Sequence, residues 1–413
     1  MKILTISNLY PPHHVGGYEV RCQQVMDRLR GRGHEVHVLT SNHAKPGVTE
    51  PDPPGIERAL RIHGFFGHPW LPMHQLLELE RENHATLIAA IKRVQPDVIH
   101  VWNMGGISKS LLHRLEDGSI PVVYDISDHW IARSLKGDVW LDWWNRRARG
   151  GSGLLRMLAE LLAQRRKFDR DAPTYPVERI AWKHIYFCSA FLRQLTLDAG
   201  YKVGHGSVIY CGVETAKFEH KTDYSQFKRL LFVGRLSEDK DPLTAIRGVA
   251  KARAHGLDVT LDLYGKGDPE YVQQLHDACA DLKLGDAVQF KSCTPEEMRR
   301  VYSQYDALLF TSNWGEPFAL TPLEAMAARL PVILVPDGGD VELGRDGENC
   351  VLAEAANPES IASGIQRLHA SATLRQQIAE NAGAEVDAQY DLKPISEQIE
   401  TFLANAIEAY RAR

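Results

Sequence analysis

The chain has 413 residues, of which 44% are apolar and 24% are charged, so it can bury two or three domain cores and is neither disordered nor fibrous. The formal net charge is −5, with 26 basic and 21 acidic residues up to position 200 and 22 basic and 32 acidic residues after it. Neither half has the strong basic excess of a protein that grips long nucleic acid, so no nucleic-acid partner is expected.

The first half alternates short apolar strands with helices. MKILTIS at 1–7 has no small-residue cleavage site, so it predicts a strand and not a secretion signal. A helix at 20–29 and a strand at 34–40 follow, and this order indicates a parallel sheet with helices on its faces. Further strands are predicted at 97–102, 121–127, 184–190 and 206–212.

The second half starts a new series of strands and helices. Two such series predict an α/β protein of two doubly wound, Rossmann-like domains facing a central cleft, because these sheets bind ligands beyond the carboxyl ends of their strands. The strands of this series are predicted at 229–235, 259–265, 287–292, 307–312 and 331–336, and the helices near 242–255, near 269–283 and from 322. The expected domains are 1–205, which contains an insertion at 131–179, 206–393, and a final amphipathic helix at 394–413 that packs back toward the N-terminal domain.

A glycine pair, Gly16 and Gly17, stands between the first strand and the first helix. Backbone N–H groups at a helix N-terminus favour an anion such as phosphate, although an ordinary flexible loop explains the pair equally well. Neither this loop nor the later Gly265-Lys266-Gly267 matches G-x-G-x-x-G, which argues against a nicotinamide-dependent oxidoreductase. The six cysteines form no C-x-x-C pair, so no metal site is expected.

Two basic residues follow the first strand of the second series. This strand ends in Gly234 and Arg235, and Lys240 comes five residues later. A guanidinium and an ammonium at a strand's carboxyl end can together hold a diphosphate. The alternative is that both are surface residues that form ion pairs with Glu238 and Asp239.

Two glutamates, Glu316 and Glu324, flank the start of the helix predicted from residue 322. Thr321 is the expected N-cap and Glu324 completes a capping box, so Glu324 has a structural explanation. Glu316 has no capping role and is expected to point into the cleft, where a carboxylate suits sugar hydroxyls.

The Gly16-Gly17 loop, the G-R-x4-K motif at Gly234 to Lys240 and the E-x7-E pair together resemble the retaining GT-B glycosyltransferases of family GT4, over nearly the whole chain. The resemblance implies a metal-independent transfer of a hexose from a nucleotide diphosphate sugar to an acceptor hydroxyl, without a cofactor. A UDP-sugar is the commoner donor in this family. The implied acceptor is a glycan, a lipid-linked glycan or a small metabolite. The resemblance implies that the domain at 1–205 binds this acceptor and that the domain at 206–393 binds the nucleotide sugar.

The resemblance also implies roles for individual residues. Arg235 and Lys240 would hold the diphosphate, Glu316 would bind hydroxyls of the donor sugar, and Glu324 would bind the ribose. The remaining residues implied to line the diphosphate and the base are Gly16, Gly17, Gly234, Tyr264, Gly265, Phe290, Lys291, Phe318, Ala319, Leu320 and Thr321.

The chain departs from the family pattern after the strand at 121–127, where Ser127 stands in the place of a common histidine. Either Asp128 or His129 can contact the donor sugar or serve as the acceptor's base, and a purely structural histidine is the alternative. Two rival functions stay open. One is a GT-B epimerase or phosphorylase, and the other is an inactive nucleotide-sugar-binding protein, which the change at Ser127 favours.

The insertion at 131–179 has no strand pattern but holds three tryptophans, a glycine-rich hinge at 150–153 and a predicted helix at 154–168. Between positions 146 and 170, eight basic residues stand against two acidic ones. One interpretation is a hairpin that packs its tryptophans internally. The other is an acceptor lid that also contacts an anionic membrane surface. Because no apolar run is long enough to span a bilayer, the expected location is the cytoplasm, with or without this contact at the inner face of the membrane.

Overall fold

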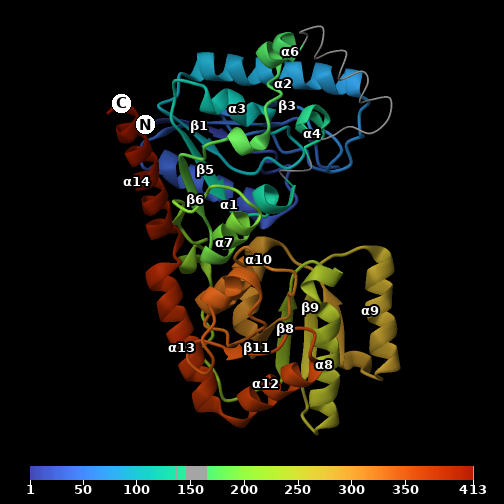
Figure 1. Cartoon of the computed structure of the whole chain (residues 1–413). Coiled ribbons are helices and arrows are strands. Elements are labelled where there is room, and N and C mark those ends of the chain that lie inside the picture. The colour runs from blue at the N-terminus through green and yellow to red at the C-terminus, as the bar shows by residue number, and fades with distance from the viewer. Residues whose placement is uncertain (135–137, 146–164, 413) are drawn as a thin grey trace. The chain divides into compact units, whose positions relative to one another are not determined.

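The computed structural model describes residues 1–134, 138–145 and 165–412 (Figure 1). The chain divides into two compact units, one of Met1–Ile209 with Ser396–Arg413 and the other of Tyr210–Ile395. Each unit is built around one parallel sheet, which confirms the predicted α/β class with two doubly wound domains.

The sheet of the first unit has seven strands in the order β3-β2-β1-β4-β5-β6-β7. The order reverses beside β1, so the loops after β1 and β4 flank the point where sheets of this kind bind ligands. The strands are β1 Lys2–Ile6, β2 Glu35–Ser41, β3 Ile56–Leu60, β4 Val98–Val101, β5 Val122–Ile126, β6 His184–Phe187 and β7 Ser207–Val208.

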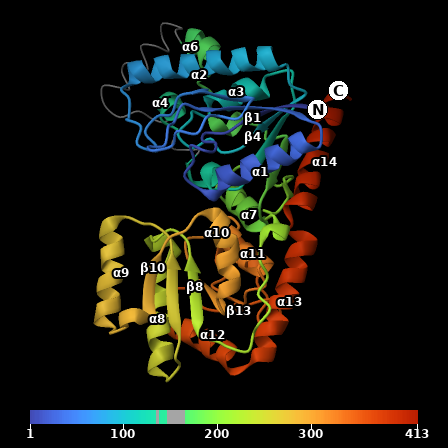
Figure 2. The same cartoon turned by 180° about the vertical axis from the view of Figure 1, so that it is seen from behind.

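Helices cover both faces of this sheet, with α2 and α3 on one face and α1 on the other (Figures 1 and 2). Helix α1 buries Cys22, Val25, Met26 and Leu29, whose spacing places them on one side of a helix. The helices are α1 Gly17–Gly31, α2 Met73–Val94, α3 Ser110–Glu116, α4 Val139–Asn145, α6 Arg165–Asp171 and α7 Ala190–Asp198.

The sheet of the second unit has six strands in the order β10-β9-β8-β11-β12-β13. Every pair along it is parallel. Its strands are β8 Arg229–Val233, β9 Thr260–Tyr264, β10 Val288–Lys291, β11 Ala307–Phe310, β12 Val332–Leu334 and β13 Val351–Leu352. Its helices are α8 Pro242–Ala254, α9 Pro269–Asp281, α10 Pro295–Val301, α11 Leu320–Ala327, α12 Pro358–Ala370 and α13 Ala372–Gln389.

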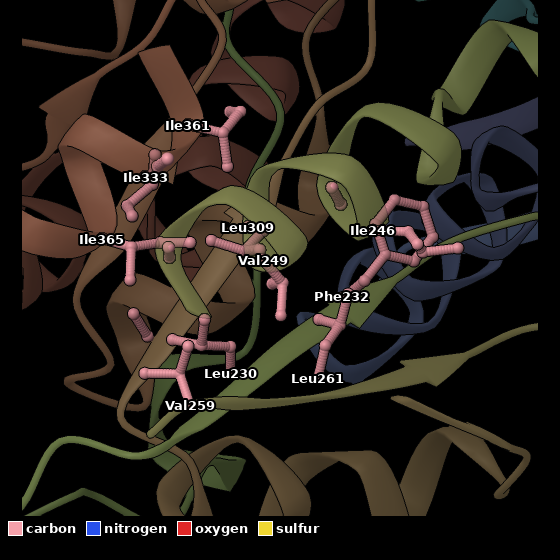
Figure 3. Close-up of a cluster of buried hydrophobic side chains, with 14 of the residues drawn as sticks. Leu230, Phe232, Ile246, Val249, Val259, Leu261, Leu309, Ile333, Ile361 and Ile365 are labelled. Carbon is pink, nitrogen blue, oxygen red and sulfur yellow. The ribbon is translucent and has the colours of Figure 1, made fainter. Parts of the chain in front are cut away.

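The core of the second unit lies where the central strands meet α8 and α12 (Figure 3). Burying one such aliphatic side chain contributes about 1.5–3 kcal/mol to the free energy of unfolding. Gly248 of α8 lets α12 come close, because a Cβ there would lie 2.5 Å from Cγ2 of Ile361. The side chains labelled in Figure 3 are Leu230, Phe232, Ile246, Val249, Val259, Leu261, Leu309, Ile333, Ile361 and Ile365.

The last helix, α14, runs from Leu392 to Arg411, and its part from Ser396 onward belongs to the first unit. Arg32 at the end of α1 donates hydrogen bonds to Glu400 at 2.5 Å and to Glu397 at 3.2 Å. The ring of Phe402 lies 5.2 Å from the ring of Tyr186 on β6. Ion pairs and apolar packing therefore hold the end of the chain on the first unit.

The strand pattern is predicted incompletely at the edges of the two sheets. Strands β3 and β13 are not predicted, because β3 is a half-buried edge strand that carries Glu57 and Arg58, and β13 has two residues. The strand predicted at 206–212 is limited to Ser207–Val208. None of the helices in the described part of the chain is both long and apolar enough to cross a bilayer.

The predicted insertion at 131–179 is described in part. Its glycine-rich hinge at 150–153 and most of the helix predicted at 154–168 lie outside the described residues. Trp140 and Trp144 are buried, at 2% and 3% exposed. These positions favour the interpretation in which the tryptophans pack internally, and contact with an anionic membrane surface stays a prediction.

Candidate functional site

A connected polar cluster lies after strand β11, at the carboxyl edge of the second sheet. The ammonium of Lys240 pairs with the carboxylate of Glu316, and Ser312 Oγ donates a hydrogen bond to Glu316 Oε1 at 2.6 Å. Glu316 is 6% exposed. Burying a carboxylate is costly unless partners compensate it, so these two contacts explain how the glutamate is held there.

The loop after β12 holds the backbone of Glu316 from the other side. The N–H of Gly339 donates to the carbonyl oxygen of Glu316 at 2.7 Å, and the N–H of Gly315 donates to the carboxylate of Asp337 at 2.6 Å. Gly338 has φ +71°, and a Cβ on it would lie 2.3 Å from the Glu316 carbonyl oxygen. Glycine is therefore required at 338 for both its backbone angle and its close approach. These loop residues are absent from the sequence-based site.

The predicted capping box at the start of α11 is wrong. The helix begins at Leu320, its N-cap is Ala319, and Thr321 is its second residue, so the Thr321 side chain does not cap it. Glu324 instead accepts a hydrogen bond from the Tyr302 hydroxyl at 2.8 Å, and burial raises the pKa of Glu324 to about 6. The extended backbone of Ala319 shifts the helix start by two residues relative to the pattern.

An unpredicted acid, Asp340, occupies the N-terminus of α11. Its Oδ1 accepts the hydrogen bond of the Ala319 N–H at 2.8 Å. The carboxyl group is fully buried, and burial, together with the nearby Glu316, raises the pKa of Asp340 well above its usual range. One backbone donor that the family resemblance assigns to the donor diphosphate thus has an acceptor within the chain.

Arg235 and Lys240 differ in their surroundings. The Arg235 side chain is 63% exposed and donates to Asp239 at 2.9 Å, as the surface-pair alternative expects. Lys240 turns inward to Glu316, and its Nζ lies 5.2 Å from the centre of the Trp314 ring. In the structure, therefore, Arg235 pairs with a partly exposed acid, Asp239, and Lys240 pairs with a buried acid, Glu316.

Gly234, beside Arg235, and Gly265, after β9, bring two strand ends together. A Cβ on Gly265 would lie 1.9 Å from the carbonyl oxygen of Gly234, and the Gly234 N–H donates to the Tyr264 carbonyl at 3.1 Å. The loops after β8 and β9 therefore continue the parallel pairing of their strands beyond the sheet.

The residues implied to wall the base lie on β9 and β10, where Tyr264 pairs in register with Lys291. Lys291 Nζ is engaged with Asp262 at 2.6 Å. The Phe290 ring lies 4.1 Å from the ring of His276 on α9. The predicted residues are neighbours in the structure, and Lys291 points along the sheet to an acid that the sequence analysis does not single out.

In the first unit, helix α1 begins at Gly17, the second glycine of the pair, and Gly16 is its N-cap. The Gly16 N–H donates to Glu19 Oε2 at 2.9 Å, so Glu19 satisfies the first donor of the helix. Burial raises the pKa of Glu19. Tyr18 donates from its hydroxyl to the Asp125 carbonyl at 2.6 Å, which ties this helix start to strand β5.

Ser127, at the end of β5, belongs to a buried ionic network. Arg21 Nη1 donates to Asp125 Oδ2 at 2.8 Å and to Ser127 Oγ at 2.9 Å, and Ser127 Oγ donates to Asp125 Oδ1 at 2.6 Å. The Arg21 and Asp125 side chains are 1% and 0% exposed. The available signal for this network is an acid inside the apolar strand PVVYDIS and an arginine on the buried side of α1.

Asp128 and His129 follow Ser127. The backbone N–H of His129 donates to Asp128 Oδ1 at 2.6 Å, and His129 is 4% exposed whereas Asp128 is half-buried. Asp128 is thus the more accessible of the two candidates for contact with a substrate. Among the described residues, no group of three His, Cys, Asp or Glu side chains is placed to hold a metal ion.

Two family models together span most of the chain. Residues 213–384 match the model of the glycosyl transferases group 1, and residues 15–217 match that of glycosyltransferase family 4. The chain belongs to the group 1, family 4 glycosyltransferases. Its resemblance to this family and its GT-B fold are therefore confirmed.

Relatives of this glycosyltransferase include an uncharacterized glycosyltransferase of Methanocaldococcus jannaschii, 26% identical over 415 residues and 96% of each chain. Seven further curated relatives align over 37% to 56% of their own length. Among solved structures, sucrose-phosphate synthase of Thermosynechococcus elongatus has a TM-score of 0.72 at 18% identity, over 98% of this chain and 99% of that one. Anabaena HepE in complex with UDP-glucose has a TM-score of 0.68 at 21% identity, over 98% and 100%.

Proposed function

We propose that this glycosyltransferase moves a hexose from a UDP-sugar to an acceptor hydroxyl with retention of configuration at the anomeric carbon. The observation that carries the proposal is the Lys240–Glu316 pair at the carboxyl edge of the second sheet. A buried carboxylate suits the hydroxyls of a sugar, and the adjacent ammonium suits a phosphate. One pair of side chains thus offers both halves of a nucleotide sugar a partner.

Donor binding exchanges the partners of this pair. The Lys240 ammonium leaves Glu316 and pairs with the diphosphate. Glu316, still held by its hydrogen bond from Ser312, accepts hydrogen bonds from the hexose hydroxyls. Arg235 leaves Asp239 and adds a second cation. An exposed pair of this kind is worth about 0–1 kcal/mol, so its loss costs little.

The chemical step breaks the bond between the anomeric carbon and the leaving phosphate oxygen and forms a bond from the acceptor oxygen to the same carbon. The acceptor proton passes to the leaving phosphate, on the face from which the acceptor attacks. Lys240 and Arg235 stabilise the negative charge that develops on the diphosphate, which supports transfer without a metal ion. Asp128 is the residue of the first unit that we assign to substrate contact.

The choice of uridine is supported by the fold neighbour HepE, which is solved with UDP-glucose. Tyr264, at the end of β9, supplies aromatic surface for a base, whereas Phe290 lies on the other face of the sheet because its register partner is Leu263. An epimerase would give a changed nucleotide sugar with no acceptor present, and an inactive binding protein would bind the donor without turnover.

The test begins with melting temperatures of the protein in UDP, GDP, ADP and dTDP, since a ligand of the folded state raises its apparent stability. UDP is expected to give the largest rise. Incubation with UDP-hexoses and EDTA should then release UDP, and the product should keep the anomeric configuration of the donor by NMR. A larger rise with another nucleotide, an inverted product or a loss of turnover in EDTA would each overturn the matching part of the proposal.

A further inference from the structure

The loop between β3 and α2, residues 61–72, exposes two large aromatic side chains. Trp70 is 62% exposed and Phe65 is 44% exposed, and they are the aromatic members of the exposed large apolar residues in the described part of the chain. An exposed indole that is also held rigidly is a sign of a binding surface, because it offers contact area at a low cost in conformational entropy.

The backbone of this loop is closed on itself. The His68 N–H donates to the Phe65 carbonyl at 2.9 Å, and the Gly64 N–H donates to the Pro69 carbonyl at 3.1 Å. Phe66 sits between them with φ +53°, an unfavourable conformation for an aromatic residue. Such a conformation persists where the surrounding structure imposes it, and it is typical of functional loops.

The Trp70 ring lies flat on the backbone of Gly64. A Cβ on Gly64 would lie 2.4, 2.4 and 2.6 Å from three atoms of the indole, which places it directly over the ring face. The His63 and Phe65 rings contact the same indole at centroid distances of 5.0 and 5.7 Å. His63 also accepts the Leu71 N–H at 2.9 Å, which fixes the chain on the far side of Trp70. One face of the indole therefore packs on Gly64, and because the residue is still 62% exposed we infer that the opposite face is open.

The loop is connected to the ligand-binding edge of the first sheet. The His63 N–H donates to the Gly106 carbonyl at 2.9 Å, and Gly106 follows β4. The Asn8 side chain, which follows β1, donates to the Gly105 carbonyl at 2.9 Å. The loops after β1 and β4 flank the reversal of strand order, so the loop that carries Trp70 is bonded to the edge at which the acceptor is expected.

We propose that the open face of Trp70 is a platform for a neutral sugar ring of the acceptor. The C–H groups of a pyranose face carry a small positive charge that suits the negative face of an indole. The imidazoles of His43 and His68, whose Nδ1 and Nε2 atoms are 3.2 Å apart, lie near Phe66 of the same loop and offer hydrogen bonds to sugar hydroxyls. Arg61, at the start of the loop, is paired with Glu82, and positions 62–72 hold no lysine or arginine, which disfavours an anionic membrane as the occupant.

This inference deepens the proposed function, on which it rests, by naming a saccharide as the acceptor class. The test applies the full chain to an array of neutral oligosaccharides. The wild type is expected to bind at least one of them, Trp70→Ala to bind it at least tenfold more weakly, and Trp70→Phe to lie in between. Gly64→Ala keeps the tryptophan but pushes its ring away, so it should lose binding as Trp70→Ala does.

Two control variants match these changes. Gly33→Ala also places a side chain at a positive φ, +88°, with no atom within 4 Å of the new Cβ. Leu282→Ala removes another exposed apolar side chain, 40% exposed, from the second unit. Both should bind the oligosaccharide as the wild type does.

Three results would overturn the proposal. The first is that the wild-type protein binds no neutral oligosaccharide, and the second is that Trp70→Ala binds as well as the wild type. The third is that the wild type co-floats with vesicles of phosphatidylcholine and phosphatidylglycerol and that Trp70→Ala does not. The UDP-induced rise in melting temperature is recorded for the same samples. A missing rise with intact oligosaccharide binding would contradict the proposed donor and leave the platform standing.

Discussion

Lys240 and Glu316 are 76 residues apart in the sequence, yet the ammonium of one pairs with the carboxylate of the other. Lys240 follows β8 and Glu316 follows β11, and these two strands are neighbours in the sheet. The pair therefore depends on the parallel topology, which brings the carboxyl ends of both strands to one edge. It is also the feature on which the proposed donor chemistry depends most.

The first prediction concerns the Lys240 charge. Lys240→Met should lower kcat by about 10²- to 10³-fold, the usual cost of removing one group that stabilises transition-state charge. Glu316→Gln should mainly raise KM for the donor. Steady-state kinetics with UDP-hexose measure both, and Lys251→Met, which breaks a surface pair with Glu359, is the control with unchanged rates. Wild-type kcat in Lys240→Met would contradict the assignment.

The second prediction separates Arg235 from Lys240. Arg235→Ala removes an exposed cation, so the free energy of unfolding should change by less than about 1 kcal/mol. KM for the donor should rise, and it should rise less at high salt because exposed charges are screened. Asp239→Asn releases the same arginine and should lower KM. Equal KM values in the wild type and both variants would show that Arg235 does not reach the diphosphate.

The third prediction tests the loop that holds Glu316. Gly338→Ala combines a positive φ with a Cβ placed 2.3 Å from the Glu316 carbonyl oxygen. The strain should cost about 1–3 kcal/mol of unfolding free energy and displace Glu316, with loss of turnover. Gly256→Ala has the matched backbone strain, φ +90°, with nothing within 4 Å of its Cβ. It should keep full turnover, and equal losses in the two variants would refute the steric argument.

The fourth prediction concerns the buried network below Ser127. Asp125→Asn removes the carboxylate charge that the buried Arg21 guanidinium pairs with, so it should cost about 3–5 kcal/mol in urea unfolding. Asp27→Asn, on the same helix α1, breaks the exposed pair with Arg30 and should cost less than about 1 kcal/mol. Similar costs for the two variants would show that burial of the Arg21–Asp125 pair is energetically unimportant.

Most of the fold can be predicted because its strands are apolar runs. The central strands of the second unit, such as β8 with its buried Leu230 and Leu231, match their predicted positions. The edge strand β3 cannot be predicted in this way, since its side chains are half-buried and mixed in polarity. The start of α11 is misplaced because Thr321 fits a capping pattern that the backbone of Ala319 does not use.

Those residues of the candidate site that belong to a sequence motif can be predicted. Those that reach the site only through tertiary contacts cannot. Arg235, Lys240 and Glu316 are found from spacing, but the partner of each depends on which strands are neighbours. Asp340 has no local signal, because its place under the Ala319 N–H is set by the path of the loop after β12. Trp70 is one of eight tryptophans, and its exposure is evident in the structure alone.

The last prediction uses Glu80, a buried acid on α2. Burial raises the pKa of Glu80 to about 8 from an ordinary value of 4.5, so between pH 4.5 and 8 the folded protein binds one proton more than the unfolded chain. The stability that this group contributes is full below pH 4.5 and is lost as the pH rises through 8. The slope is about 1.4 kcal/mol per pH unit for one proton.

Two buried histidines have the opposite effect at lower pH. Burial lowers the pKa of His84 to about 3 and that of His100 to about 4, so the stability they contribute is full above pH 6.5 and is lost as the pH falls below it. Of these three groups, Glu80 alone changes stability between pH 6.5 and 8. Glu80→Gln, which mimics the protonated acid, should therefore gain about 1–2 kcal/mol relative to the wild type across that interval.

Urea unfolding at about pH 6.5, 7.2 and 8.0 measures the difference in unfolding free energy between Glu80→Gln and the wild type. Glu82→Gln is the matched control, because Glu82 lies on the same helix with its side chain 57% exposed, and its profile should run parallel to that of the wild type. A Glu80→Gln profile parallel to the wild type would mean that Glu80 is ionised in the folded protein. Its hydrogen bond from Ser110 Oγ, at 2.6 Å, would then be the contact that holds the charge.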